Sequence, residues 1–264
     1  MRIPPAALRP LAFAAAVVMV ALLGAGVGRR LLPDGSPGQR ELLVAAASDL
    51  RFAFADIGER FEQETGITVT FNFGSTGLLT QQIENGAPFD VFFSANRAYV
   101  DRLVQGGFGA GDPQVYAIGY VALVVPRGSV VPLAGEIAGP AFETIAIANP
   151  AHAPYGVAAR QVLQQLKLYD RVRDRLVYGE NVLDAMRLVE TGNADVGLVA
   201  LAFLDAAEGL LGEKIDAALH EPIEQTALVL REAENSAAAE EFSAFVNDTV
   251  GRQILVRYRF GLPQ

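Results

Sequence analysis

From residue 41 onward, short β-rich runs alternate with single helical patterns. Three runs open this part of the chain: ELLVAAA (41–47), ITVTFNF (67–73) and FDVFFSA (89–95). Apolar residues spaced four, three and four apart follow the first run and predict one helix face: Leu50, Phe54, Ile57 and Phe61. Strands separated by single helices favour a parallel sheet with right-handed crossovers. The sequence therefore predicts an α/β fold.

A second unit with the same alternation lies in the middle of the chain. Its expected strands are TIAIANP (144–150), RLVYGE (175–180) and ADVGLVAL (194–201), with helices over 155–167 and 182–191. Two long β-rich runs, around 116–126 and 221–230, flank it. We predict two lobes, each a mixed, mostly parallel sheet with flanking helices, joined by two crossover strands. The first lobe would contain 41–120 and 228–264, and the second 121–227.

Residues 1–40 differ from the rest of the sequence. Arg2 and Arg9 precede 17 uncharged residues, LAFAAAVVMVALLGAGV (11–27), and Arg29 and Arg30 follow them. A positively charged start with an apolar span is typical of an export signal, which predicts a periplasmic or extracytoplasmic protein. The span is close to the lower limit for crossing a bilayer, so both a cleaved signal peptide and a retained anchor with a tether remain open.

The composition argues against several classes of function. Residues 1–40 contain five arginines and one aspartate, which leaves 16 basic and 29 acidic side chains in the remaining 224 residues, a formal charge of −13. That balance provides no basic stripe for nucleic acid. There is no cysteine, and the two histidines, His152 and His220, are far apart. We therefore expect neither a disulfide nor a zinc site.

Four strand-to-helix corners share one chemical character. They are AAASDL (45–50), FGSTGL (73–78), NPAHAPYG (149–156) and GENVLD (179–184), and none contains lysine or arginine. Each can be an ordinary helix cap. Because ligands of open α/β sheets bind at the carboxyl ends of the strands, the four corners can also line one cleft. Neutral helix N-termini there favour a dehydrated tetrahedral oxyanion.

The order of these segments resembles the periplasmic molybdate-binding proteins of ABC transporters, the ModA family. The resemblance runs through AASDL, GITVTFNFGSTGLLTQQIENGAPFDVFFSAN, IAIANPAHAPYG, VYGENVLDA, GNADVGLVAL and RYRFGLP, and covers nearly all of 41–264. It implies a two-lobed, class II periplasmic binding protein fold with molybdate or tungstate between the lobes.

The resemblance also implies a set of oxyanion-binding residues: Ser48, Asp49, Ser75, Thr76, Tyr155 and Val182. Asp49 departs from the neutral residue of the family, so we expect only its backbone N–H to donate. Thr76 falls at the family's serine position, and Ser75 is its neighbour. Tyr155 would supply the tyrosine donor that other members take from the last strand, where this chain has only Ala200. The prolines of the third corner would then fix the turn that directs Tyr155 to an oxygen, although Tyr155 could also be a half-buried tyrosine in water.

Three other polar residues could be mistaken for ligand-binding or catalytic residues, but we expect them to have structural roles. His152 is expected to be a turn residue. Asp90 and Asp195 each open a strand without a partner acid or base, so we predict structural roles for both.

The sequence thus predicts a monomeric, non-enzymatic receptor that delivers molybdate or tungstate to an ABC permease in the membrane. It would need no cofactor, no metal beyond that of the bound oxyanion, and no nucleic acid. Two alternatives stay open. One is a binding protein for another oxyanion, sulfate above all. The other is an exported α/β enzyme acting on phosphorylated substrates, which the lack of GxxxxGK[ST], GxGxxG and GxSxG motifs disfavours.

Overall fold

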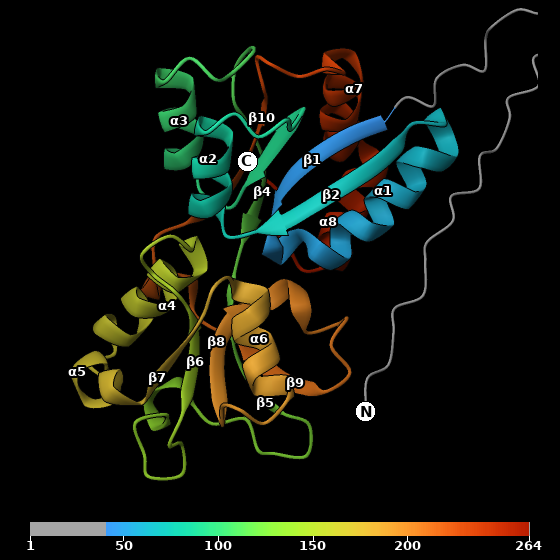
Figure 1. Ribbon diagram of the computed structural model, residues 1–264. Coiled ribbons are helices and arrows are strands. Elements are labelled where there is room, and N and C mark those ends of the chain that lie inside the picture. The colour runs from blue at the N-terminus through green and yellow to red at the C-terminus, as the bar shows by residue number, and fades with distance from the viewer. Residues whose placement is uncertain (1–40, 264) are drawn as a thin grey trace, which may run out of the picture. The chain divides into compact units, whose positions relative to one another are not determined.

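Two five-stranded mixed sheets form the framework of the chain, as the computed structural model shows for residues 41–263 (Figure 1). The predicted export segment, 1–40, lies outside the described residues. Among residues 41–263, no helix is long and apolar enough to cross a bilayer. Each sheet has two parallel and two antiparallel pairings in this part of the chain. The two-lobed α/β prediction is confirmed, but parallel pairs do not dominate either sheet.

The first sheet has the strand order β2-β1-β3-β10-β4. Its strands are β1 (Glu41–Ala47), β2 (Thr68–Gly74), β3 (Val91–Ser94), β4 (Gln114–Gly119) and β10 (Ile223–Val229). β1 pairs in parallel with β2 and β3, whereas β10 returns antiparallel between β3 and β4. The carboxyl ends of β1 and β2 therefore meet at one edge of the sheet, where the first two corners begin.

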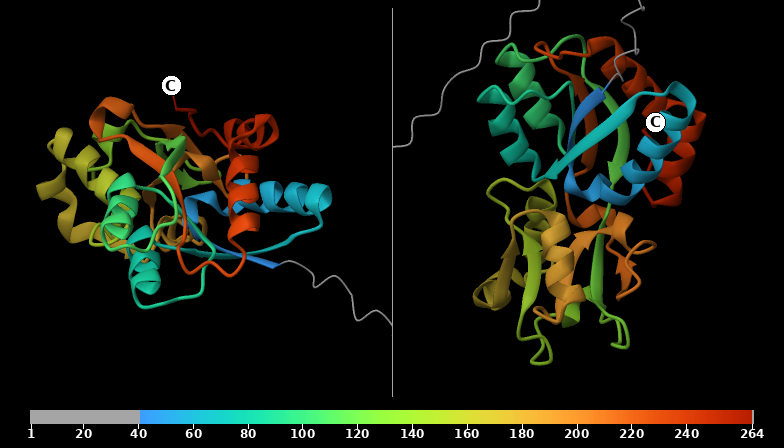
Figure 2. Two further views of the ribbon diagram at one scale, coloured as in Figure 1. Left: turned by 90° about the horizontal axis from the view of Figure 1, so that it is seen from above. Right: turned by 45° about the vertical axis from the view of Figure 1, so that its right-hand side comes forward.

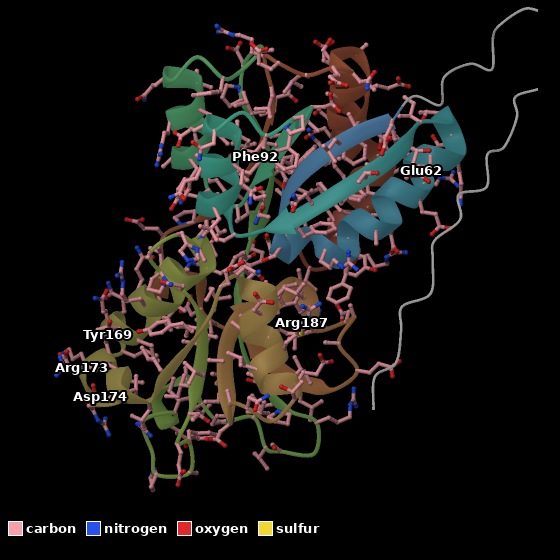
Figure 3. All side chains as sticks on the ribbon, in the orientation of Figure 1. Glu62, Phe92, Tyr169, Arg173, Asp174 and Arg187 are labelled. Atoms are coloured by element: carbon pink, nitrogen blue, oxygen red, sulfur yellow. The ribbon has the colours of Figure 1, made fainter. Side chains whose placement is uncertain are left out.

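Helices cover both faces of the first sheet (Figures 1 and 2). They are α1 (Arg51–Thr65), α2 (Thr76–Glu84), α3 (Arg97–Gln105), α7 (Ser236–Asn247) and α8 (Thr249–Arg257). The adjacent Phe92 and Phe93 are both fully buried but belong to opposite faces, as the alternation of a strand requires. Phe92 packs with α2 and α3 (Figure 3). Phe93 meets Phe54 of α1 edge to face, with ring centroids 4.9 Å apart.

The second sheet has the order β7-β6-β8-β5-β9. Its strands are β5 (Val121–Pro126), β6 (Ile145–Ala148), β7 (Leu176–Gly179), β8 (Val196–Ala200) and β9 (Leu210–Lys214). The helices of this lobe are α4 (Pro154–Gln165), α5 (Tyr169–Val172) and α6 (Val182–Glu190). Short 3₁₀ segments complete the two lobes: η1 (Ser48–Leu50), η2 (Ala134–Glu136), η3 (Arg173–Arg175), η4 (Leu201–Phe203) and η5 (Ala217–Leu219).

The two crossings between the lobes differ in detail from the prediction. The run 116–126 is not one strand, because β4 ends at Gly119 in the first sheet and β5 begins at Val121 in the second. Residues 223–227, which the sequence analysis placed in the second lobe, pair with β3 and β4 as part of β10. The chain therefore returns to the first lobe before residue 223, after β9, a strand that the sequence pattern did not reveal.

Candidate oxyanion-binding site

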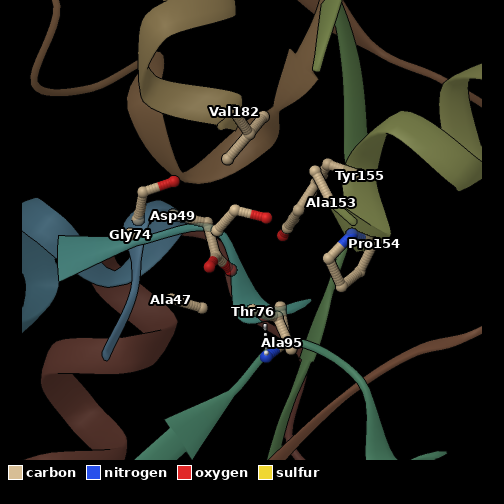
Figure 4. Close-up of a pocket in the computed structure, with 11 residues that line it drawn as sticks. Ala47, Asp49, Gly74, Thr76, Ala95, Ala153, Pro154, Tyr155 and Val182 are labelled. Atoms are coloured by element: carbon tan, nitrogen blue, oxygen red, sulfur yellow. Dashed lines mark hydrogen bonds between the residues drawn. The ribbon is translucent and has the colours of Figure 1, made fainter. Parts of the chain in front are cut away.

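One small pocket is lined by all six residues that the family resemblance implied (Figure 4). Its lining is Ala47, Ser48, Asp49, Gly74, Ser75, Thr76, Ala95, Ala153, Pro154, Tyr155 and Val182. Residues of both lobes contribute, and each of the four strand-to-helix corners supplies at least one. The six implied residues are each at most 3% exposed. The structure therefore brings the predicted set together, while its binding role stays a prediction.

The two corners of the first lobe leave helix donors free. Ala47 precedes η1 and Ser75 precedes α2, and neither side chain caps its helix. Because the first N–H groups of a helix have no intrahelical acceptor, those of Ser48 and Thr76 are available to a ligand. The N–H of Asp49 has no helical acceptor either, but it interacts with its own carboxylate. The Thr76 hydroxyl accepts a hydrogen bond from the N–H of Ala95 at 3.2 Å, which leaves its own proton free to donate.

Ser75 makes a different contact from the one implied by the family. Its hydroxyl donates to the backbone oxygen of His152 at 2.7 Å and lies 2.8 Å from the Nδ1 of the same histidine. The N–H of Gly77 donates to that backbone oxygen as well, at 2.9 Å. Because a hydroxyl has one proton, the Ser75 side chain cannot donate to an anion while it holds His152. His152 is a turn residue, as predicted, and it also joins the two lobes.

The third corner is held by local hydrogen bonds and two prolines. Asn149 accepts from the N–H of Ala151 through its side chain at 3.0 Å and from Ala153 through its backbone oxygen at 2.9 Å. Pro154 occupies the first position of α4, where a missing N–H costs nothing. A Cβ on Gly156 would lie 2.2 Å from the backbone oxygen of Ala148, so only glycine fits there. This tight turn places Tyr155 in the pocket.

The fourth corner is capped by its own side chain. Asn181 precedes α6, and its Oδ1 accepts from the N–H groups of Leu183 and Asp184 at 3.0 and 3.1 Å. Val182 is the first residue of α6 and lines the pocket, and its N–H has no intrahelical acceptor. One backbone donor is thus the main contribution of this corner.

Two buried oxygens in the pocket lack hydrogen-bond partners among the described residues: Asp49 Oδ1 and Tyr155 Oη. The other carboxylate oxygen, Oδ2, accepts from Gln225 Nε2 at 2.6 Å. Tyr155 also approaches Gly119 so closely that a Cβ there would lie 2.3 Å from the hydroxyl. Since unpartnered buried polar atoms are rare in native proteins, these two oxygens indicate a place for a ligand.

Burial dominates the ionisation of this cluster. It raises the pKa of Asp49 from 3.8 to about 7, although the nearby Tyr155 hydroxyl and the Gln225 amide oppose that rise. The Tyr155 hydroxyl lies close enough to the Asp49 carboxyl to lower its pKa, but the two groups do not have the geometry of a hydrogen bond. Burial, together with the Asp49 charge, raises the pKa of Tyr155 and of Tyr116 well above 10. Both tyrosines therefore keep their protons at neutral pH and can act only as neutral groups.

The sequence analysis missed Gln225, Tyr116 and Gly119. Gln225 is fully buried in the middle of β10, and Tyr116, on β4, donates to its Oε1 at 3.4 Å. A signal was present, because a glutamine at the centre of the run EPIEQTALVL is a polar residue at a core position. Its partner could not be read from the sequence, since Asp49 lies 176 residues away.

Asp90 and Asp195 have the structural roles that were predicted. Asp90 accepts from the N–H groups of Leu43 and Asn235, at 2.8 and 2.9 Å. Asp195 accepts from the N–H groups of Glu143 and Thr144, each at 2.8 Å. Across residues 41–263, no group of three or more histidine, cysteine or acidic side chains is placed to hold a metal ion.

Comparison with known proteins decides the family. The model of the bacterial extracellular solute-binding proteins matches residues 42–261. The chain belongs to this family. Among its relatives, this solute-binding protein is 36% identical over 227 residues to the molybdate-binding protein ModA of Azotobacter vinelandii, covering 84% of this chain and 90% of the relative. It is 33% identical over 257 residues to ModA of Rhodobacter capsulatus, covering 97% of each.

The solved structures agree with the sequence relatives. The periplasmic molybdate-binding protein of Azotobacter vinelandii superposes on this solute-binding protein with a TM-score of 0.80 and 34% identity, covering 84% of this chain and all of the other. The predicted two-lobed fold of the ModA family is therefore confirmed.

Proposed function

We propose that this solute-binding protein captures molybdate, and also tungstate, between its lobes and delivers the anion to an ABC permease. The observation that supports this most strongly is the pocket itself. It is formed by corners of both lobes, and it offers hydroxyls and helix N–H groups without any lysine or arginine. The relatives named molybdate-binding protein supply the identity of the anion.

The proposed donors divide into side chains and backbone groups. The hydroxyls of Ser48, Thr76 and Tyr155 would donate to oxygens of the anion, and the N–H groups of Asp49 and Val182 would complete the shell. Ser75 would instead hold the two lobes together through His152, because its hydroxyl proton is already used. Donors held in fixed positions by the fold suit a dehydrated tetrahedral anion. The site then selects its anion by the geometry of these donors.

The remaining parts of the proposal follow from the family and from the N-terminal sequence. The protein would act as a binding protein and not as an enzyme, without a cofactor, on the outer side of the membrane. The N-terminal segment, 1–40, would direct export and either be removed or remain as an anchor.

Thermal melting in the presence of four anions tests the proposal. A ligand that binds only the folded state adds about 4 kcal/mol at a concentration a thousandfold above Kd. This is roughly 8–16 °C in melting temperature for a protein of this size. Submillimolar molybdate and tungstate should each produce a shift of several degrees, and equal sulfate or phosphate about a degree or less. A larger shift with sulfate would reassign the anion, and no shift with any anion would overturn the proposed binding site.

A further inference from the structure

A single carboxyl group interrupts a pocket of otherwise neutral donors. Asp49 lines the pocket and is 1% exposed. One oxygen, Oδ2, is held by Gln225, whereas Oδ1 has no partner among the described residues. The hydroxyl of Tyr155, the expected donor to the anion, is also unpartnered. A charged carboxylate in this position would face a bound dianion inside a desolvated pocket, which is strongly unfavourable.

No positive group compensates the Asp49 charge from the elements packed around it. Tyr155 comes from α4, Tyr116 from β4 and Gln225 from β10, and all three are neutral near pH 7. The neighbouring segments β2 and η4 have no ionisable side chain.

Charged or titratable groups on the other packed elements have contacts of their own, and none of them influences the pKa of Asp49. Arg51 of α1 lies over the Phe73 ring at 5.2 Å. Asp184 of α6 accepts from Asn181 at 2.9 Å and pairs with Arg187 at 3.5 Å. His152, on the turn before α4, is held by Ser75 at 2.8 Å. Asp49 would therefore avoid the repulsion with a bound anion by becoming protonated.

We propose that the pocket binds its oxyanion together with one proton, and that Asp49 holds this proton on Oδ1. The proton comes from solvent and no covalent bond to the anion forms. Protonation removes the repulsion and converts Oδ1 from an acceptor into an additional donor, directed to the anion or to Tyr155. Burial already raises the pKa of Asp49 to about 7, so the proton is bound at little cost near neutral pH, and the bound dianion then keeps it in place at higher pH. This inference rests on the proposed function and adds a second ligand to the same site.

Calorimetric titration with molybdate tests the coupling directly. At pH 8, in two buffers of different ionisation enthalpy, the difference in heat gives the number of protons taken up, and we expect nearly one per anion. Above pH 7, Kd should rise about tenfold per pH unit, because the unliganded protein then loses the proton that the complex needs. Molybdate remains a dianion in this range. Equal Kd values at pH 6.5 and 8.5, with no buffer dependence, would overturn the inference.

The variant Asp49→Asn is the matched control for proton uptake by Asp49. The amide can accept from Gln225 through its oxygen and place a permanent donor where Oδ1 stands, so its affinity should not depend on pH and no proton should be taken up. Uptake of one proton by this variant would assign the proton to another group and overturn the role of Asp49. If neither protein binds molybdate at any pH, the proposed function fails.

Thermal melting without any anion tests the raised pKa of Asp49 even if neither protein binds molybdate. A pKa raised above its unfolded value stabilises the protein below the unfolded pKa, and the stabilisation is lost as the pH rises through the folded pKa. For Asp49 this loss falls between about pH 4 and 7. Asp49→Asn should therefore melt higher than the wild type at pH 8, and the gap should shrink towards pH 5. A gap that is constant with pH would contradict the inference.

Discussion

The two lobes contribute to the pocket in different ways. In the first lobe, the corners at Ser48 and Thr76 have no side-chain cap, so their helix N–H groups stay free. In the second lobe, Asn181 caps α6 with its own side chain, and Pro154 begins α4 without an N–H. The second lobe offers mainly the Tyr155 hydroxyl, the Val182 N–H and a contact to the first lobe.

If the proposed site is correct, this difference would give the lobes separate roles in capture. The first lobe would hold an anion by several donors before the lobes close. The second lobe would add the Tyr155 hydroxyl and stabilise the closed form through the contact of His152 with Ser75. A ligand that touches both lobes favours closure by its differential affinity. Substitutions in the first lobe should therefore remove binding, whereas those in the second lobe or at the contact should weaken it.

The largest effect is expected for Thr76→Asp. It places a second carboxylate among the donors of the first lobe, where the anion and the new charge would repel each other in a desolvated site. Molybdate affinity should fall by about a thousandfold or more, roughly 4 kcal/mol, in calorimetric titration. Gln81→Glu adds the same charge on the exposed side of α2 and should change affinity little. If Thr76→Asp still binds tightly, the first lobe is not the main source of donors.

Tyr155→Phe should have the next largest effect. A hydrogen bond to a charged partner contributes about 1.5–3 kcal/mol, so affinity should fall by this amount. Because the second lobe acts on closure, the change should appear mainly as faster dissociation of molybdate in stopped-flow measurements. Tyr178→Phe, at a residue 49% exposed and outside the pocket, is the control. An unchanged Kd would show that Tyr155 does not contact the anion.

Gly77→Ala should act on closure alone. Its Cβ would lie 2.7 Å from the backbone oxygen of His152, across the contact between the lobes. Overpacking of this kind costs about 1–2 kcal/mol and should weaken molybdate binding accordingly. Small-angle scattering at saturating molybdate should show a smaller radius of gyration for the wild type than for Gly77→Ala. Gly135→Ala has open space around the new Cβ and should behave as the wild type.

Ser75→Ala should have the smallest effect. It removes one hydrogen bond between the lobes, worth about 0.5–1.5 kcal/mol, and leaves the anion donors in place. Calorimetric titration should therefore show at most about a tenfold weaker Kd for molybdate. Ser129→Ala, on an exposed loop, is the control. A loss as large as that of Tyr155→Phe would mean that Ser75 donates to the anion after all.

Much of this architecture was predictable because it depends on local periodicity. The spacing of Leu50, Phe54, Ile57 and Phe61 predicted the buried face of α1 and the segment before it, and all four side chains are fully buried. The strand-to-helix corners were visible as small and hydroxyl residues behind apolar runs. Their convergence on one pocket followed from a general rule, since the carboxyl ends of the strands face the ligand in open α/β sheets.

The sequence by itself determined the two-lobed α/β fold, the four strand-to-helix corners without lysine or arginine, and the family. Only the tertiary structure decided which of these residues are free to bind. Ser75 and His152 are 77 residues apart, and Asp49 and Gln225 are 176 apart. Whether a hydroxyl proton is already used, or a carboxyl keeps its proton, depends on what surrounds the side chain in space. Burial and hydrogen-bond partners come from distant parts of the chain, so no local pattern could assign them.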